Sequence, residues 1–296
     1  MISVIVPCYN CAPYLARAIE SVLAQNHADY EIILVNNNST DRTQDIINDY
    51  VLKYPAIISS YQENRRGATF ARNLGLSVAK GQYVQFLDAD DELEPEKFSR
   101  QLELMECSRA GLLLGSFTRI RRNGVKFELV NKYDHLWKSF AASQLGITSS
   151  NLYRAEDIRN VGGWNEQLSS CQEYDLLFNL LIRNIDVCYD VISSAKIHEV
   201  ANSISRTTNK ERTIEILAEY VKQRQQLKVY LKSQGKLDNK TETFIDLCIY
   251  RTLLGRKLHC KEFVVSQLND LRLKVDIVNR FKLNLLYTVR ALLNKI

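Results

Sequence analysis

The sequence predicts an α/β protein with a mostly parallel, Rossmann-like sheet, flanking helices and a helical C-terminal appendage. In the first 95 residues, four β-rich runs alternate with stretches whose apolar residues recur at helical spacing, which is typical of a doubly wound sheet. From residue 206 onward only helical patterns follow, with 19 Lys and Arg against 9 Asp and Glu. Residues 1–205 carry 20 Lys and Arg against 25 Asp and Glu. We interpret the acidic part as catalytic and the basic part as an attachment surface.

The composition is that of a soluble globular protein. Of 296 residues, 46% are hydrophobic and 25% are charged. The seven cysteines are an odd number and do not suggest a disulfide framework or a metal site, so we expect reduced thiols. The first residues already form a strand pattern, and no apolar run reaches the roughly 18 residues of a membrane span. We therefore expect a cytoplasmic protein.

The polar loops of the predicted sheet should meet at one edge. The expected strands are residues 2–6, 30–35, 56–61 and 81–87. The helix after the third strand is expected over residues 68–79 and ends before Gly81. Because parallel strands bring the loops that follow them to the same edge, and open α/β sheets bind ligands there, these loops are candidate site segments.

The fourth strand ends in an acidic run. Asp88, Asp90, Asp91 and Glu92 follow it directly, ahead of Pro95. Carboxylates at this density suit Mg²⁺ or Mn²⁺, which complete their coordination with substrate phosphates. The same acids could instead start a helix opened by Pro95 and offset its dipole. The run alone does not decide between these alternatives.

Three other polar positions near this edge also allow two interpretations. Tyr9 could stack on a flat ring or simply pack. The Asn residues at 36–38 could read a nucleobase or make a turn, with Ser39 to Asp41 capping the next helix. Arg72 could meet a diphosphate or lie in solvent, and its spacing alone favours solvent.

Taken in order, several blocks resemble the successive motifs of the family 2 glycosyltransferases, which have the GT-A fold: VIVPCYN, EIILVNNNSTDRT, GATFARNLGLSVAKGQYVQFLDADDELEP and VGGWNEQLSSCQEYDLLFNLLIR. The resemblance covers residues 3 to about 205. It implies a catalytic domain over 1–205, with a nucleotide-sugar half over 1–95 and an acceptor-side half over 96–205. Residues 206–296 would then be a basic helical region.

Such enzymes move a sugar from a nucleotide diphosphate sugar to an acceptor hydroxyl, with inversion and a bound Mn²⁺ or Mg²⁺. For this chain, the resemblance implies an enzyme of the hexosyltransferase type. The resemblance implies a role in polysaccharide or glycoconjugate biosynthesis. The partners would be a nucleotide-sugar donor and a glycan or lipid-linked acceptor, and no nucleic acid is expected.

The resemblance assigns the donor residues by position. Pro7 and Tyr9 match the loop that packs on the nucleotide base, and Asn64 and Arg72 match contacts to the nucleotide and the sugar diphosphate. Asn37 stands where the family usually has an Asp that accepts the N3 proton of uracil. An amide can still accept one hydrogen bond and donate another, so a UDP-sugar remains expected while other bases are not excluded.

The acidic residues divide between the two substrates. Asp88 matches the first acid of the family's Asp-x-Asp, near the ribose or donor sugar, and Asp90 matches the metal ligand. His198 matches a histidine near the metal or diphosphate, although a lone histidine is often structural. Asp91 and Glu92 then fit better as helix-start charges.

The second chemical centre is Gln172-Glu173, where the family normally has Glu-Asp or a variant. Glu173 takes the position of the general base that removes the acceptor proton. Asp175 is better explained as a first-turn acid of the following helix. Elsewhere, Asn123-Gly124 predicts a hairpin, and Trp137 is either an acceptor platform or, as we favour, a packing residue.

The last segment, residues 276–296, predicts a basic amphipathic helix. It could lie on an anionic membrane surface as a peripheral contact, or pack on the catalytic domain. Two other classes compete with a transferase. A dinucleotide oxidoreductase is disfavoured because no Gly-x-Gly-x-x-Gly follows the first strand. A non-catalytic nucleotide-sugar or nucleic-acid binding protein remains the alternative.

Overall fold

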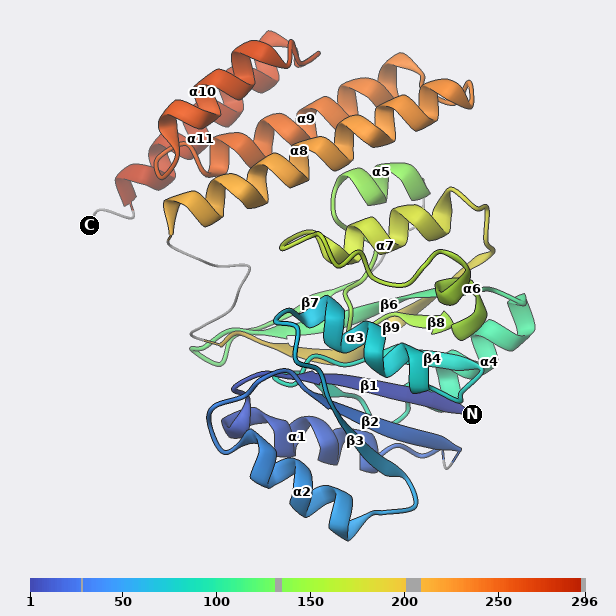
Figure 1. The fold of residues 1–296 in the computed structure, drawn as a ribbon. Coiled ribbons are helices and arrows are strands. Elements are labelled where there is room, and N and C mark those ends of the chain that lie inside the picture. The colour runs from blue at the N-terminus through green and yellow to red at the C-terminus, as the bar shows by residue number, and fades with distance from the viewer. Residues whose placement is uncertain (28, 131–134, 201–208, 294–296) are drawn as a thin grey trace. The chain divides into compact units, whose positions relative to one another are not determined.

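The computed structural model describes residues 1–27, 29–130, 135–200 and 209–293 (Figure 1). The chain forms two compact units. The catalytic-type unit comprises residues 1–132 and 145–201, and the helical unit comprises residues 133–144 and 202–296. Residues 133–144 were expected in the acceptor-side half but group with the helical unit. The expected boundary at residue 205 lies outside the described residues.

The first unit is built on a mixed sheet. Its strand order is β3-β2-β1-β4-β8-β6-β9-β5, and β7 pairs with β6 outside this path. Neighbours from β3 to β4 are parallel, as are β6 and β9, whereas β8 is antiparallel to both β4 and β6. The strands are β1 (Ile2–Cys8), β2 (Tyr30–Asn36), β3 (Ile58–Gln62), β4 (Tyr83–Phe86), β5 (Glu92–Leu93), β6 (Leu112–Ile120), β7 (Lys126–Leu129), β8 (Leu152–Arg154) and β9 (Val187–His198).

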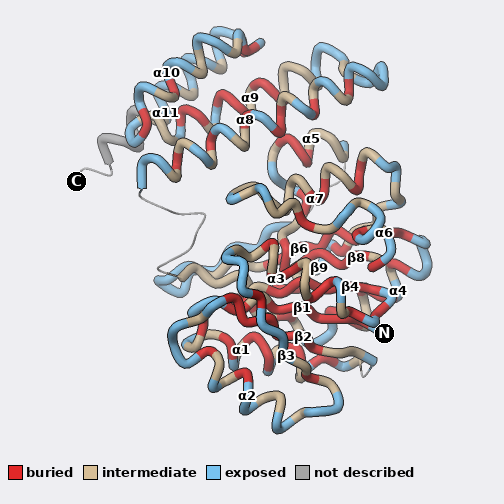
Figure 2. Tube along the Cα trace, viewed as in Figure 1, coloured by how far each residue is buried: buried red, intermediate tan, exposed pale blue. Residues whose placement is uncertain are grey.

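Helices cover both faces of this sheet (Figure 1), which confirms the predicted α/β class. One face packs a continuous apolar core from β1, β2, α1, α2 and α4, and α3 and α7 lie on the other face. The central strand β1 is buried almost throughout (Figure 2), as expected for a parallel strand covered on both sides. The helices are α1 (Ala12–Leu23), α2 (Thr43–Lys53), α3 (Ala68–Val78), α4 (Lys97–Ser108), α6 (Ala155–Asn160) and α7 (Gln172–Leu181).

The acidic run does not enter a helix. The expectation that Asp91 and Glu92 are helix-start charges is wrong, because α4 begins only at Lys97 and has no acid in its first turn. Glu92 instead belongs to β5 and pairs with Lys196 of β9. Strand pairing therefore takes Glu92 back to the sheet, and Asp91 beside it accepts a hydrogen bond from the backbone N–H of His198 in β9.

The hairpin predicted at Asn123-Gly124 is confirmed. It joins β6 to the antiparallel β7. Gly124 adopts a φ of 80°, which suits glycine, and the side chain of Asn123 accepts a hydrogen bond from the N–H of Val125 at 3.2 Å.

The second unit is helical, as predicted. Trp137 packs within it, with its ring centre 6.2 Å from that of Phe140 and 5.3 Å from that of Tyr230. This confirms a packing role for the tryptophan. No helix in the described ranges is long and apolar enough to cross a membrane. The helices are α5 (Leu136–Ala141), α8 (Lys210–Ser233), α9 (Asn239–Gly255), α10 (Lys261–Asp270) and α11 (Ile277–Leu293).

The contact between α3 and β1 gives a stability prediction. A Cβ added at Gly75 of α3 would lie 2.3 Å from Cγ2 of the fully buried Ile5. We expect Gly75→Ala to lower the free energy of unfolding by about 1–3 kcal/mol, because overpacking outweighs the better helix propensity of alanine. Ser77→Ala, at an exposed position of the same helix, should change it by less than about 0.5 kcal/mol. Urea denaturation measures both, and equal effects would contradict the packing argument.

Candidate active site

The loops after β1 and β2 meet at the carboxyl edge of the sheet, as predicted. Pro7 is the penultimate residue of β1. Tyr9 comes directly after the end of this strand, with 45% of its surface exposed. The guanidinium of Arg66 lies over the Tyr9 ring, 5.4 Å from its centre, and donates a hydrogen bond to its hydroxyl at 3.0 Å. Tyr9 thus presents an accessible aromatic face beside a cation.

Asn37 is buried and holds the neighbouring loop through its side chain. Its Nδ2 donates to the carbonyl oxygens of Glu63 at 2.9 Å and Arg65 at 2.7 Å. Its Oδ1 accepts from the N–H of Gly67, where α3 begins, at 2.8 Å. The amide therefore uses both of its donors within the protein, and one lone pair of Oδ1 remains for a ligand. Asn64, in the loop so held, is exposed.

Arg72 of α3 links Asp88 to the start of α7. Arg72 is 7% exposed, and its guanidinium donates to Oδ1 of Asp88 at 2.7 Å and to Oε1 of Gln172 at 3.3 Å. It also lies over the ring of the buried Trp164, with its carbon 4.5 Å from the ring centre. Burial thus places Arg72 inside the protein and not in solvent. The contact orients Asp88 at the end of β4 toward the N-terminus of α7.

Glu173 occupies the first turn of α7, directly after Gln172. Burial, reinforced by the charge of Asp88, raises the pKa of its carboxyl from 4.5 to about 8, while Arg72 acts in the opposite direction. Its Oε1 lies 3.5 Å from Nδ2 of Asn151. A carboxyl group that gives up its proton near neutral pH is suited to act as a general base.

Asp90 lies just beyond Asp88 in a partly buried position. Burial and the neighbouring charge of Asp88 raise its pKa to about 6. Arg17 donates to the backbone carbonyl oxygen of Asp90, so this contact does not occupy the side-chain carboxylate. A cation beside this carboxylate would offset the effect of burial on its pKa.

His198 ends β9 next to this acidic run. Its ring Nε2 lies 2.6 Å from Oε1 of Glu92, and its backbone N–H donates to Oδ1 of Asp91 at 3.1 Å. Burial and the nearby Arg17 lower the pKa of His198, which favours the neutral imidazole, while Glu92 acts in the opposite direction. A neutral imidazole held by a carboxylate at one nitrogen is the state in which histidine binds metals.

The donor set suits a hard divalent cation only in part. In the described part of the chain, no three His, Cys, Asp or Glu side chains gather as a complete ligand set. Mg²⁺ and Mn²⁺ sites in which substrate phosphates supply further oxygens need only one or two carboxylates. Asp90 and the second oxygen of Asp88, whose side chain is 34% exposed, meet that requirement.

Several site residues escaped sequence reasoning. Trp164 lies in a block that was identified, but only packing shows it beneath Arg72. Arg17 gives no local signal, since it comes from an ordinary amphipathic helix. The sequence also contains a Cys-x-x-Cys around Tyr9. This pair is visible in the sequence and was missed. In the structure Cys8 and Cys11 are both buried free thiols of the apolar core.

The fold is that of a GT-A glycosyltransferase. The chain belongs to glycosyl transferase family 2, whose profile matches residues 3–163.

Known proteins similar to this chain come from several organisms. An Escherichia coli UDP-Glc:alpha-D-GlcNAc-diphosphoundecaprenol beta-1,3-glucosyltransferase, WfaP, is 39% identical over 109 residues, or 37% of this chain and 43% of its own length. The chain spans less than half the length of the first curated relatives that it matches.

Two solved structures share the fold. S. aureus TarS 1–349 in complex with UDP-GlcNAc has a TM-score of 0.64 at 18% identity, over 92% of this chain and 76% of that one. The Pyrobaculum calidifontis mannosyltransferase PcManGT, in complex with GDP-Man and Mn²⁺, has a TM-score of 0.62 at 16% identity, over 98% and 79% of the two chains.

The raised pKa of Glu173 predicts a pH-dependent stability effect. The folded state keeps the proton of Glu173 up to about pH 8, and the unfolded state loses it near 4.5. The stability contributed by the protonated carboxyl is therefore lost as the pH rises through this window. We expect the free energy of unfolding of Glu173→Gln, relative to that of the wild type, to increase by about 1–3 kcal/mol as the pH rises from 5 to 9. Thermal and urea unfolding across this range measure the difference, and a constant offset would contradict the pKa shift.

Proposed function

We propose that this protein is an inverting, metal-dependent glycosyltransferase of hexosyltransferase type. It would move a sugar from a nucleotide diphosphate sugar, with a UDP-sugar the first candidate, to an acceptor hydroxyl in polysaccharide or glycoconjugate biosynthesis. The observation that carries the proposal is that Arg72 bonds both Asp88 and Gln172, and so links Asp88 and Asp90, which we assign to the donor side, to the segment that carries Glu173.

Glu173 is assigned as the general base. Inversion requires one displacement, in which the acceptor oxygen attacks the anomeric carbon as a carboxylate takes its proton. The environment that raises the pKa of Glu173 to about 8 brings it into the range where it can hold that proton and release it afterwards. Gln172 keeps the start of α7 bound to Arg72, which fixes the orientation of the base.

The donor side holds the nucleotide and the leaving diphosphate. Tyr9 offers a stacking surface for the base, and Asn37, together with the loop of Asn64, forms the wall beside it. Arg72 supplies positive charge next to Asp88. A Mn²⁺ or Mg²⁺ ion held by Asp90, with His198 close by, would stabilise the negative charge that develops on the diphosphate.

A peripheral contact with an anionic membrane is proposed for α11. Its apolar residues Phe281 and Leu285 are 69% and 54% exposed, and Arg280 and Lys282 lie on the same helix. Exposed apolar side chains with neighbouring cations favour the interface of an anionic bilayer. The rest of the predicted amphipathic face, from residue 288 onward, lies beyond the described side chains. Such a contact would bring the enzyme to a lipid-linked acceptor.

Glu173→Gln should abolish transfer while leaving donor affinity largely unchanged. The amide cannot take the acceptor proton, so we expect kcat to fall by about 10²–10⁴-fold. Asp175→Asn, in the same helical turn, is the matched control and should keep kcat within about threefold. Nucleotide release with a panel of acceptors measures kcat, and calorimetry measures UDP binding. Near-normal turnover in Glu173→Gln would show that Glu173 is not the general base.

Asp90→Asn should weaken the dependence of donor binding on metal. If Asp90 holds the cation, adding Mn²⁺ should tighten UDP binding by the wild type at least tenfold and hardly affect the variant. Glu94→Gln, in the same segment, removes a carboxylate that pairs with Lys196 and should retain the metal effect. Equal metal dependence in wild type and Asp90→Asn would exclude Asp90 as the ligand.

A further inference from the structure

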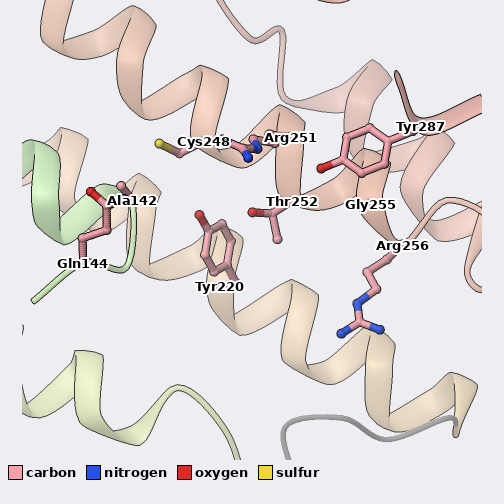
Figure 3. Close-up of a pocket in the computed structure, with 9 residues that line it drawn as sticks. All are labelled: Ala142, Gln144, Tyr220, Cys248, Arg251, Thr252, Gly255, Arg256 and Tyr287. Carbon is pink, nitrogen blue, oxygen red and sulfur yellow. The ribbon is translucent and has the colours of Figure 1, made fainter. Parts of the chain in front are cut away.

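Buried polar groups of the catalytic-type unit converge on residues 148–151. The cavity of about 350 Å³ in the helical unit, by contrast, is lined by polar groups that are spread out or already engaged (Figure 3). Its arginines, Arg251 and Arg256, lie at different ends of it. The hydroxyl of Tyr220 donates to the carbonyl oxygen that ends α5 at 3.3 Å, and the guanidinium carbon of Arg224 lies 3.6 Å from the centre of its ring.

The backbone of residues 148–151 is fixed by three buried side chains. Lys97 and Gln101 of α4 donate to the carbonyl oxygen of Ser150, at 2.8 Å and 3.2 Å. Gln85 of β4 donates to the carbonyl oxygen of Ser149 at 3.2 Å. All five of these residues are fully buried. Because water cannot replace such bonds without exposing the groups, the two serine side chains start from a rigid backbone.

The acidic run after β4 forms a turn that carries Asp90. The backbone N–H of Asp91 donates to the carbonyl oxygen of Asp88 at 3.0 Å, which closes a β-turn. Ala89 and Asp90 are the two central residues of this turn. The position of the Asp90 carboxylate therefore depends on how the two ends of the turn are held.

The hydroxyl of Ser149 bonds to both ends of this turn. Its Oγ accepts from the backbone N–H of Asp88 at 3.2 Å and donates to Oδ2 of Asp91 at 2.7 Å. A serine hydroxyl has one proton and two lone pairs, so it can make both bonds at once. The other carboxylate oxygen of Asp91 accepts from the backbone N–H of His198 at 3.1 Å. Ser149 and Asp91 thus also fix the turn relative to the end of β9.

We propose that Ser149 is a positioning residue for the donor-side cation, because its hydroxyl holds the turn of residues 88–91 in the conformation in which Asp90 can bind the ion. In the proposed function, on which this inference rests, Asp90 holds Mn²⁺ or Mg²⁺. Such ions demand close to ideal ligand geometry. Groups that orient a metal ligand typically contribute about 10–100-fold to metal affinity without touching the ion.

The contact between this segment and the base is held separately. Nδ2 of Asn151 lies 3.5 Å from Oε1 of Glu173. The same amide accepts from the backbone N–H of Gly115 and donates to the carbonyl oxygen of Leu145, both at 3.0 Å. Loss of the Ser149 hydroxyl should therefore affect metal-linked donor binding and leave the orientation of the base unchanged.

The test compares Ser149→Ala with the matched control Ser150→Ala. Ser150 is equally buried, but its hydroxyl donates to the carbonyl oxygens of Gly115 and Ile147 and not to the turn. Calorimetry measures the UDP affinity of the full chain over a series of Mn²⁺ concentrations. We expect Ser149→Ala to raise the Mn²⁺ midpoint of the gain in UDP affinity about tenfold or more, and Ser150→Ala to raise it less than about threefold. UDP affinity without metal should stay close to that of the wild type in both variants.

Excess metal separates a positioning residue from a ligand. Ser149→Ala keeps the Asp90 carboxylate, so saturating Mn²⁺ should restore its UDP affinity to nearly the wild-type value, whereas Asp90→Asn should not recover. Asp91→Asn approaches the same bond from the other end. Its amide nitrogen replaces one acceptor oxygen, so it should also raise the Mn²⁺ midpoint, and it keeps the size of the side chain if Ser149→Ala fails to fold. Melting temperatures report folding.

An unchanged Mn²⁺ midpoint in folded Ser149→Ala or in Asp91→Asn would overturn the proposal and leave the transferase function intact. An equal increase in Ser150→Ala would do so as well, because it would indicate a general effect of losing a buried hydroxyl. A wild type whose UDP affinity does not respond to Mn²⁺ would contradict the metal-dependent function itself, and the role of Ser149 with it.

Discussion

The buried guanidinium of Arg72 is the interaction on which the rest of the active site depends. It comes from α3, hydrogen bonds to Asp88 at the end of β4 and to Gln172 at the start of α7, and lies over Trp164. Removing Asp88 would leave the buried guanidinium of Arg72 without its charged partner, which is unfavourable because solvent cannot replace that partner. Three segments far apart in sequence are thus held in one arrangement, and Asp88, Arg72 and Glu173 share one electrostatic environment.

The acidic run after β4 shows how neighbouring carboxylates acquire different tasks. Asp88 is bound by Arg72, Asp91 is buried against Ser149 and the backbone of His198, and Glu92 pairs with Arg17 and His198. Asp90 is the one whose carboxylate these contacts leave for a ligand. Neighbouring carboxylates therefore have different partners because of the strand geometry, since the return of the chain into β5 turns two of the acids toward the sheet.

The alternating pattern of the first 95 residues predicted the parallel part of the sheet and its loop edge well, because strand period and helix period are local properties. The acidic run could be identified as a candidate for the same reason, whereas Glu173 was assigned from the resemblance to the family motif. What the sequence could not supply was long-range packing. The pairing of Glu92 with β9, the position of Trp164 under Arg72 and the grouping of residues 133–144 with the helical unit all involve partners distant in the chain. The Cys-x-x-Cys at residues 8–11 was readable and was overlooked.

The side chain of Asn37 constrains which substitutions the donor loop can accept. Its two N–H groups satisfy the carbonyl oxygens of Glu63 and Arg65, and its oxygen accepts from Gly67. A carboxylate donates nothing, so an aspartate here would face two carbonyl oxygens with like partial charge and leave both without a donor. The loop would have to move before aspartate became acceptable. Asn37 and the loop of residues 63–67 therefore behave as an epistatic unit, in which the residue at position 37 and the loop conformation can change only together.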